Sequence, residues 1–270
     1  MQDYITVCEQ AARRGGAILL DWQGRINPRE KAPKDLVSEA DLASQKAIYE
    51  IVHSAFPDHD FLGEEGNPIA IAQRESEFRW IVDPLDGTVN YVHQLPAYSV
   101  SVALEQRGEL QAGVVYDPIA DECFSAVRGE GAFLNGAKIE VSGCDSLRTA
   151  LVAASFSAGV SRDAEEINRF LDVLVECQAL RRLGSAALNL AYLAAGRLDA
   201  YWATSVKVWD VAAGLLLVQE AGGSVSGVAG EPFDLSRPRF AAASSKTLHS
   251  ALIGILKREA TGNSAPADFP

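Results

Sequence analysis

Residues 81–91, IVDPLDGTVNY, limit the folds open to this chain because they place two like charges at the end of an apolar strand. Asp83 and Asp86 stand three positions apart, with Pro84 between them and Gly87-Thr88 directly after them. Two carboxylates held together repel each other, and removing them from water costs free energy. The fold must therefore bring positive charge to this point.

The first half of the chain has the pattern of an α+β unit. Apolar residues at helical spacing predict two helices, over residues 3–22 and from about Ser38 to Phe56, joined by a turn-rich connector over 24–33. Short strand patterns separated by turn signals then run through residues 79–141. They predict a largely antiparallel sheet.

The pattern changes near residue 148, where strands begin to alternate with helices. The predicted strands are 149–155, 199–202, 224–228 and 239–245, and the predicted helices are 163–178, 184–195, 209–222 and 247–257. Such alternation is typical of an α/β arrangement. We therefore expect an N-terminal α+β domain over 1–147, a C-terminal α/β domain over 148–260 and a flexible tail over 261–270.

The composition argues against several classes of protein. A formal net charge of −12 disfavours binding to nucleic acid or to a membrane surface. No apolar run is long enough to cross a membrane, and the N-terminal residues lack the pattern of a signal peptide. The four cysteines form no C-x-x-C pair, which predicts reduced thiols in a cytoplasmic protein.

Acidic residues stand at the ends of several predicted elements. They are Asp41 in DLVSEAD, Glu64-Glu65 in FLGEEG, the Asp83 and Asp86 pair, and Asp210 in VWDVAAG. Carboxylate and carbonyl oxygens are the ligands that Mg²⁺ prefers. If Pro84 bends the chain, Asp83 and Asp86 can bind one ion from two directions, with the Leu85 carbonyl facing the same space. Two or three ions at such a cluster would form a clamp for phosphoryl transfer to water.

Gly87-Thr88 adds a further element of the same chemistry. If a helix begins here, its first N–H groups are unpaired and can bind phosphate. The Thr88 hydroxyl could orient a water molecule, while Asp41 could hold Thr88 and help to remove the proton. Each acid also has a structural alternative, because a D-x-x-D pair can be a solvated turn and Asp41 or Asp210 can be a helix N-cap.

Taken together, these motifs resemble the inositol monophosphatase family, within the superfamily of lithium-sensitive, magnesium-dependent phosphatases. The two long signatures are WIVDPLDGTVNYVH and VWDVAAGLLLVQEAGG. DLVSEAD, FPDHDFLGEEG, GEGAFLNG and RRLGSAALNLAYLAAGRLDAYW also match, so the likeness runs from about residue 3 to about residue 257. The resemblance implies a layered α/β/α/β/α sandwich of the sugar-phosphatase type, two to three Mg²⁺ ions per site, lithium sensitivity and a homodimer.

The resemblance also implies roles for individual residues. The implied metal ligands are Glu64, Asp83, the Leu85 carbonyl, Asp86 and, from the C-terminal domain, Asp210. The implied catalytic residues, which activate the attacking water, are Thr88, Asp41 and Glu64. The implied substrate-binding residues are Gly87 and Thr88 through their N–H groups to the phosphate, then Ser157, Gly184, Ser185, Ala186 and the residue at position 203.

Position 203 departs from the family pattern. In members that hydrolyse inositol phosphates, a glutamate that binds substrate hydroxyls lies seven residues before the aspartate of the second signature, whereas this chain has Ala203 there. A methyl group cannot accept a hydrogen bond from a polyol, and losing such a contact costs on the order of 1–3 kcal/mol of discrimination. The departure bears on specificity rather than on the metal and water groups.

We therefore expect a Mg²⁺-dependent phosphoric monoester hydrolase that uses metal-activated water on a small phosphorylated polyol, with inositol monophosphate as the leading substrate. Histidinol phosphate, fructose bisphosphate, nucleoside bisphosphate and NADP stay open as alternative substrates. The alternative from another class is a catalytically weak regulatory protein with the same fold.

Overall fold

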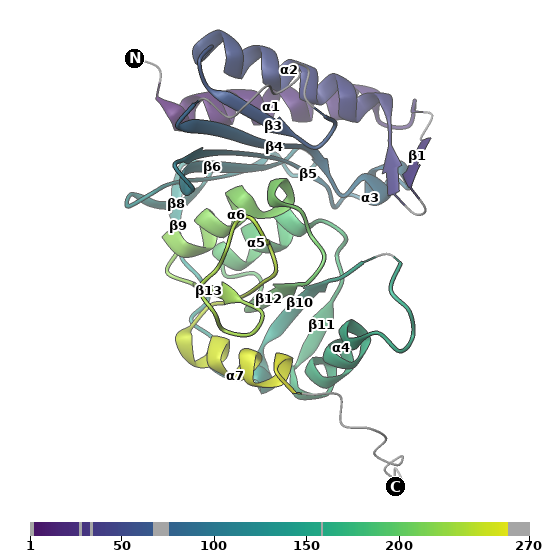
Figure 1. Cartoon of the computed structure of the whole chain (residues 1–270), viewed down its shortest axis with the longest axis vertical. Coiled ribbons are helices and arrows are strands. Elements are labelled where there is room, and N and C mark those ends of the chain that lie inside the picture. Colours follow the sequence, from purple (N-terminus) through teal and green to yellow (C-terminus); the bar gives the residue numbers. More distant parts are fainter. Residues whose placement is uncertain (1–2, 27–28, 33–34, 67–75, 158, 259–270) are drawn as a thin grey trace, which may run out of the picture.

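Helices and sheets alternate in five layers along the longest axis of the molecule (Figure 1). The computed structural model describes residues 3–26, 29–32, 35–66, 76–157 and 159–258, so the tail predicted over 261–270 lies outside the described residues. The order of layers confirms the predicted α/β/α/β/α sandwich. No helix in the described part of the chain combines the length and apolar character needed to cross a membrane.

The first sheet has seven strands in the order in which they occur along the chain. These strands are β3 (Asp60–Gly63), β4 (Phe78–Asp86), β5 (Ser99–Gln106), β6 (Glu109–Asp117), β7 (Glu122–Val127), β8 (Gly131–Leu134) and β9 (Ala137–Ile139). Only β3 and β4 pair in parallel, and every later pair is antiparallel. The antiparallel sheet predicted for this region is therefore confirmed.

Helices α1 (Tyr4–Trp22) and α2 (Glu39–Ala55) cover the outer face of this sheet (Figure 1). Apolar side chains at helical spacing on α1, such as Val7, Ala11 and Leu19, are buried against it. Ser38 caps α2 by accepting a hydrogen bond from the Ala40 N–H.

The second sheet has five strands in the order β11-β10-β12-β14-β13. Their bounds are β10 (Leu151–Ser155), β11 (Ala179–Arg181), β12 (Ala200–Ala203), β13 (Ser224–Gly227) and β14 (Phe240–Ala243). Strand β10 runs parallel to both β11 and β12, as expected from the alternation of strands and helices. Helices α4 (Glu165–Glu176) and α7 (Lys246–Leu256) lie on its outer side (Figure 1).

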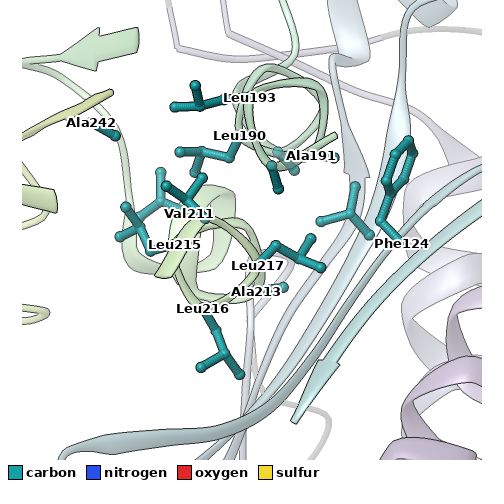
Figure 2. Close-up of a cluster of buried hydrophobic side chains, with 14 of the residues drawn as sticks. Phe124, Leu190, Ala191, Leu193, Val211, Ala213, Leu215, Leu216, Leu217 and Ala242 are labelled. Atoms are coloured by element: carbon teal, nitrogen blue, oxygen red, sulfur yellow. The ribbon is translucent and has the colours of Figure 1, made fainter. Parts of the chain in front are cut away.

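Helices α5 (Ala186–Ala194) and α6 (Val208–Glu220) form the middle layer between the two sheets. Eight consecutive residues of α6, 211–218, are buried, and a helix that is apolar all round must be covered all round. Figure 2 shows Val211 and Leu215 on the side of Ala242 and Leu217 on the side of Phe124. The apolar run of the second signature thus places α6 in the core of the molecule.

Four strands, β11 among them, and one 3₁₀ turn were absent from the predictions. Strands β1 (Arg29–Ala32) and β2 (Asp35–Val37) form an antiparallel pair where the sequence predicts a connector. Strand β3 is four residues long and too short to give a clear period. A 3₁₀ turn, η1 (Leu147–Thr149), lies at the expected boundary near residue 148, and the division into two domains there stays a prediction.

Gly113 lets α6 lie directly on the first sheet, which makes it a test of this packing. A Cβ at Gly113 would come within 2.9 Å of the Ala213 Cα on α6. We predict that Gly113→Ala lowers the free energy of unfolding by about 1–3 kcal/mol, because the helix backbone must move away.

Gly254 is the matched control, since it lies within α7 with no atom within 4 Å of the added Cβ. Gly254→Ala should raise the free energy of unfolding by about 0.5–1 kcal/mol through helix propensity. Urea denaturation of both variants measures whether each substitution lowers or raises the free energy of unfolding. Equal effects of the two substitutions would contradict the packing described.

Candidate active site

Asp83 and Asp86 lie at the end of β4, and both are buried. Asp83 pairs with Ser101 and Asp86 with Ser99, so the strand contains one extra residue between them. This bulge is the bend predicted at Pro84, a residue that cannot donate to the strand ladder. The Leu85 N–H turns back and donates to Asp83 Oδ1 at 2.9 Å.

Asp86 is bound by the first turn of α5. Ser185, the N-cap residue, donates its hydroxyl hydrogen to Asp86 Oδ2. The Ala187 N–H donates to the same oxygen at 2.7 Å, and the Ala186 N–H donates to Oδ1 at 3.2 Å. The free N–H groups of a helix start thus stabilise this carboxylate as an anion.

Asp210 is the third residue of α6. Its Oδ2 accepts a hydrogen bond from the Lys207 N–H at 2.8 Å, which closes the first turn of the helix. The Trp209 carbonyl accepts a hydrogen bond from Ser101 Oγ at 3.1 Å. This bond joins the start of α6 to β5, beside the strand that carries Asp83.

Asp41 and Thr88 face each other, as the sequence predicted. Asp41 is fully buried in the first turn of α2, where its Oδ2 accepts hydrogen bonds from the Ser38 N–H at 2.9 Å and hydroxyl at 2.6 Å. Thr88 Oγ1 lies 3.4 Å from Asp41 Oδ1 and 3.1 Å from the Leu85 carbonyl oxygen. Asp41 therefore caps a helix with one oxygen and reaches Thr88 with the other.

Glu64 directly follows β3 and lies beside the end of β4. Its N–H donates to the Val82 carbonyl at 3.1 Å, which extends the parallel pairing of β3 and β4. The N–H of the next residue, Glu65, donates a hydrogen bond to Gln45 Oε1 at 2.9 Å. The hydrogen bond from Glu64 fixes its backbone beside Val82, the residue that directly precedes Asp83.

The pKa values of these acids reflect a shared, buried cluster. Burial raises the pKa of Asp83 well above its ordinary value, and the charges of Glu64, Asp86 and Asp210 raise it further. Burial and the charge of Asp86 raise the pKa of Asp210 to about 8. Burial raises the pKa of Asp86 to about 6 although its hydrogen bonds oppose the shift, and burial likewise raises the pKa of Asp41 to about 6.

The charge of Lys207 lowers the pKa of Asp210 but forms no ion pair with it. Within the described residues, Asp41, Asp83, Asp86 and Asp210 form no ion pair with lysine, arginine or histidine. Buried charges normally have a paired cation or a metal ion. Within the described part of the chain, ion pairs therefore do not supply the positive charge that the sequence requires at this point.

The donor set fits a hard divalent cation. Its members offer carboxylate and carbonyl oxygens, which Mg²⁺ prefers, and no thiol or imidazole is among them. Among the residues the structure describes, no three histidine, cysteine, aspartate or glutamate side chains already form a set that would hold an ion. Asp83, Asp86 and Asp210 instead accept hydrogen bonds from the chain, so binding an ion requires small movements of their carboxylates.

The predicted substrate residues fall into two groups. Gly87 and the segment Gly184–Ala186 adjoin Asp86, and Gly87 has a left-handed φ of 96° at the start of α3 (Thr88–Val92). Ser157 lies on an exposed turn after β10, and Ala203 is fully buried at the end of β12. The structure thus places Gly87 and the segment Gly184–Ala186 beside the acidic cluster. Among the described residues, no hydrogen bond links Ser157 or Ala203 to that cluster.

Two positioning residues were missed by the sequence reasoning. Asn90 donates to the carbonyls of Leu183 at 2.8 Å and Ala97 at 2.7 Å, so it ties α3 to the segment before α5. Nothing in its spacing signals this contact across 93 positions. Ser38 holds Asp41, and here the S-x-x-D spacing was a readable capping signal.

A family model described as the inositol monophosphatase family matches residues 1–260. The Nus factor SuhB of Pseudomonas aeruginosa is 38% identical over 94% of this chain and 96% of its own length. The inositol-1-monophosphatase of Mesorhizobium japonicum is 41% identical over 84% of this chain and 86% of its own. The chain belongs to the inositol monophosphatase family, a family of phosphoric monoester hydrolases, as the sequence predicted.

Solved structures agree with this assignment. The extragenic suppressor protein suhB from Bartonella henselae superposes with a TM-score of 0.88, at 38% identity, over 94% of this chain and 98% of its own. An IMPase/NADP phosphatase complexed with Mg²⁺ and phosphate gives a TM-score of 0.80 at 27% identity, over 91% of each chain. The layered fold is thus common to this chain and to a Mg²⁺-binding phosphatase.

Ser185 and Ser245 form a matched pair that separates capping from the positioning of Asp86. Each serine caps a helix by accepting an N–H at its third residue, but only Ser185 donates to an acid of the cluster, whereas Ser245 donates to the Cys144 carbonyl. We predict that either serine-to-alanine change costs about 1 kcal/mol of stability. Only Ser185→Ala should also weaken the Mg²⁺ dependence of thermal stability and of phosphate release, by roughly 10–100-fold. Equal Mg²⁺ responses of the two variants would refute this role.

The raised pKa values predict that the metal-free protein loses stability as pH rises. When a carboxyl group has a higher pKa in the folded than in the unfolded state, its protonation stabilises the fold. This stabilisation is complete below the ordinary pKa of 3.8, and it is lost as the pH rises through about 6 for Asp86 and about 8 for Asp210. With a chelator present, the melting temperature should fall across this interval, and Mg²⁺ should restore it most at the alkaline end. Asp210→Asn should flatten the dependence; a steeper fall in that variant would contradict the assignment.

Proposed function

We propose that this chain hydrolyses the phosphate monoester of a small polyol at the acidic cluster, with Mg²⁺ bound there. The observation that carries the proposal is the convergence of Asp210, on α6, with Asp83 and Asp86, on β4, where burial raises all three pKa values and neighbouring carboxylates raise those of Asp83 and Asp210 further. The family membership and a structural relative complexed with Mg²⁺ and phosphate support it. Asp83, Asp86, Asp210, Glu64 and the Leu85 carbonyl would hold the ions.

When bound, Mg²⁺ would supply the positive charge that neutralises phosphate oxygens, lowers the pKa of water and stabilises the leaving oxygen. The side chains of this protein orient the reactants and receive the proton. Thr88 Oγ1 would take the proton of the attacking water as it passes its own proton to Asp41 Oδ1, 3.4 Å away. With a pKa of about 6, Asp41 is mostly ionised at neutral pH and can accept that proton.

The backbone between Asp86 and Thr88 receives the phosphate in this proposal. Gly87 adopts a left-handed φ of 96°, and a Cβ there would approach the Ala97 carbonyl oxygen to 3.0 Å. The absence of a side chain lets the phosphate approach the N–H groups of Gly87 and Thr88. Ser185 and Ala186 act in this account by fixing Asp86.

Inositol monophosphate is the leading substrate in this proposal, and Ala203 is the reason to compare it with others. The fully buried methyl group offers no acceptor to a polyol hydroxyl. Histidinol phosphate, fructose bisphosphate, nucleoside bisphosphate and NADP are the competing substrates, and values of kcat/KM across this panel with Mg²⁺ would rank them. Lithium sensitivity, a homodimer and a cytoplasmic location remain part of the proposal.

Asp86→Asn tests the proposal, with the exposed Asp145→Asn as its control. Removing one charge from the cluster should reduce phosphate release by at least about 100-fold, because losing one charge-stabilising group commonly costs about 10²–10³ in kcat. The variant should fold and should gain little thermal stability from Mg²⁺. Wild-type turnover by Asp86→Asn would end the proposal. Absence of phosphate release by the wild-type protein would instead favour the regulatory alternative.

A further inference from the structure

A cavity of about 730 Å³ lies beside the first turn of α6. Its described lining comes from β4 and β5, from the turn between β5 and β6, from the start of α6 and from the connection between β13 and β14. None of the five proposed metal-binding residues is among its described lining residues. Its volume falls within the range of small-molecule sites, about 300–1,000 Å³.

Of the two cations among the described lining residues, Lys207 forms no ion pair, although its charge lowers the pKa of Asp210. Arg79 donates through Nε to Glu105 Oε2 at 2.9 Å, and the Asp234 carboxylate accepts from Arg237 Nε at 3.1 Å and from Ser236. Lys207 is exposed and forms no ion pair within the described ranges. Lys207 is the N-cap residue of α6, at the positive end of the helix dipole.

The rest of the lining is largely apolar. Trp209 and Phe233 are aromatic, and Leu235 follows Phe233 by two positions along the chain. All three are only partly buried and pack with their inner sides on the core. The cavity thus offers an apolar wall with two rings next to an unpaired positive charge.

We propose that this cavity binds a small amphipathic anion, with an aromatic or branched apolar body and one acidic group such as a carboxylate, sulfonate or phosphate. The acidic group pairs with Lys207, and the body packs on Trp209 and Phe233. The ligand would lie against the turn that presents Asp210, whose Oδ2 accepts the Lys207 N–H at 2.8 Å. This binding site goes beyond the proposed reaction, and its test requires no turnover.

The probe for the test is 8-anilinonaphthalene-1-sulfonate, an aromatic anion whose fluorescence rises on binding. Its matched partner is N-phenyl-1-naphthylamine, which has the same rings without the sulfonate. Fluorescence titration and calorimetry of the folded full chain should give one sulfonate probe per chain. The uncharged probe should bind at least about tenfold more weakly, because hydrogen bonds to charged groups contribute that much or more.

Three variants locate the binding. Lys207→Ala should weaken the sulfonate probe about tenfold and leave the uncharged probe unchanged. Ser236→Trp, at an exposed lining residue, should block both probes by filling the cavity. Lys46→Ala, a lysine that is 77% exposed on α2, should change nothing.

A competing apolar surface on α4 is tested separately, because Leu171, Leu174 and Val175 are exposed there. Val175→Glu should leave probe binding intact. Loss of binding in Val175→Glu, unchanged binding in both Lys207→Ala and Ser236→Trp, or no stoichiometric binding to wild type would each overturn the proposal. None of these outcomes bears on phosphate release, so the failure of this site and of the proposed reaction are distinguishable.

Discussion

The hydrogen bonds between Asp86 and the first turn of α5 hold the two halves of the active site together. They join the last residue of β4 to a helix that begins 100 positions later. A carboxylate that accepts three such bonds is stabilised as an anion, so part of the cost of burying it is met by the chain itself. Asp83 and Asp210 have fewer such bonds, and burial with mutual repulsion raises their pKa values further.

The middle layer explains how acids so far apart in the sequence become neighbours. Helices α5 and α6 pack closely, since a Cβ at Gly214 would come within 2.5 Å of the Leu190 Cβ. Both helices begin beside the end of β4, where α5 binds Asp86 and α6 presents Asp210. The apolar residues that hold α6 between the sheets (Figure 2) therefore also fix the position of an acid in the cluster.

The sequence predicted those features that depend on local pattern. Apolar periodicity identified the long helices and the antiparallel sheet, and the D-x-x-D pair after an apolar run identified the end of β4. Contacts between residues far apart in the sequence could not be predicted from local pattern. The hydrogen bond from the Ser185 hydroxyl to Asp86 is one such contact, because it depends on how β4 and α5 pack rather than on sequence spacing. The β1–β2 pair was missed because its strands are only a few residues long.

The central claim is that carboxylates from separate segments share divalent cations at the end of β4. Anomalous diffraction from a crystal grown with Mn²⁺ and phosphate measures this directly. Mn²⁺ takes the same oxygen ligands as Mg²⁺, and its anomalous signal identifies its position. We expect anomalous peaks within bonding distance of Asp83, Asp86 and Asp210, with phosphate adjacent to Gly87. Ordered phosphate elsewhere, or no peak between these three carboxylates, would contradict the account.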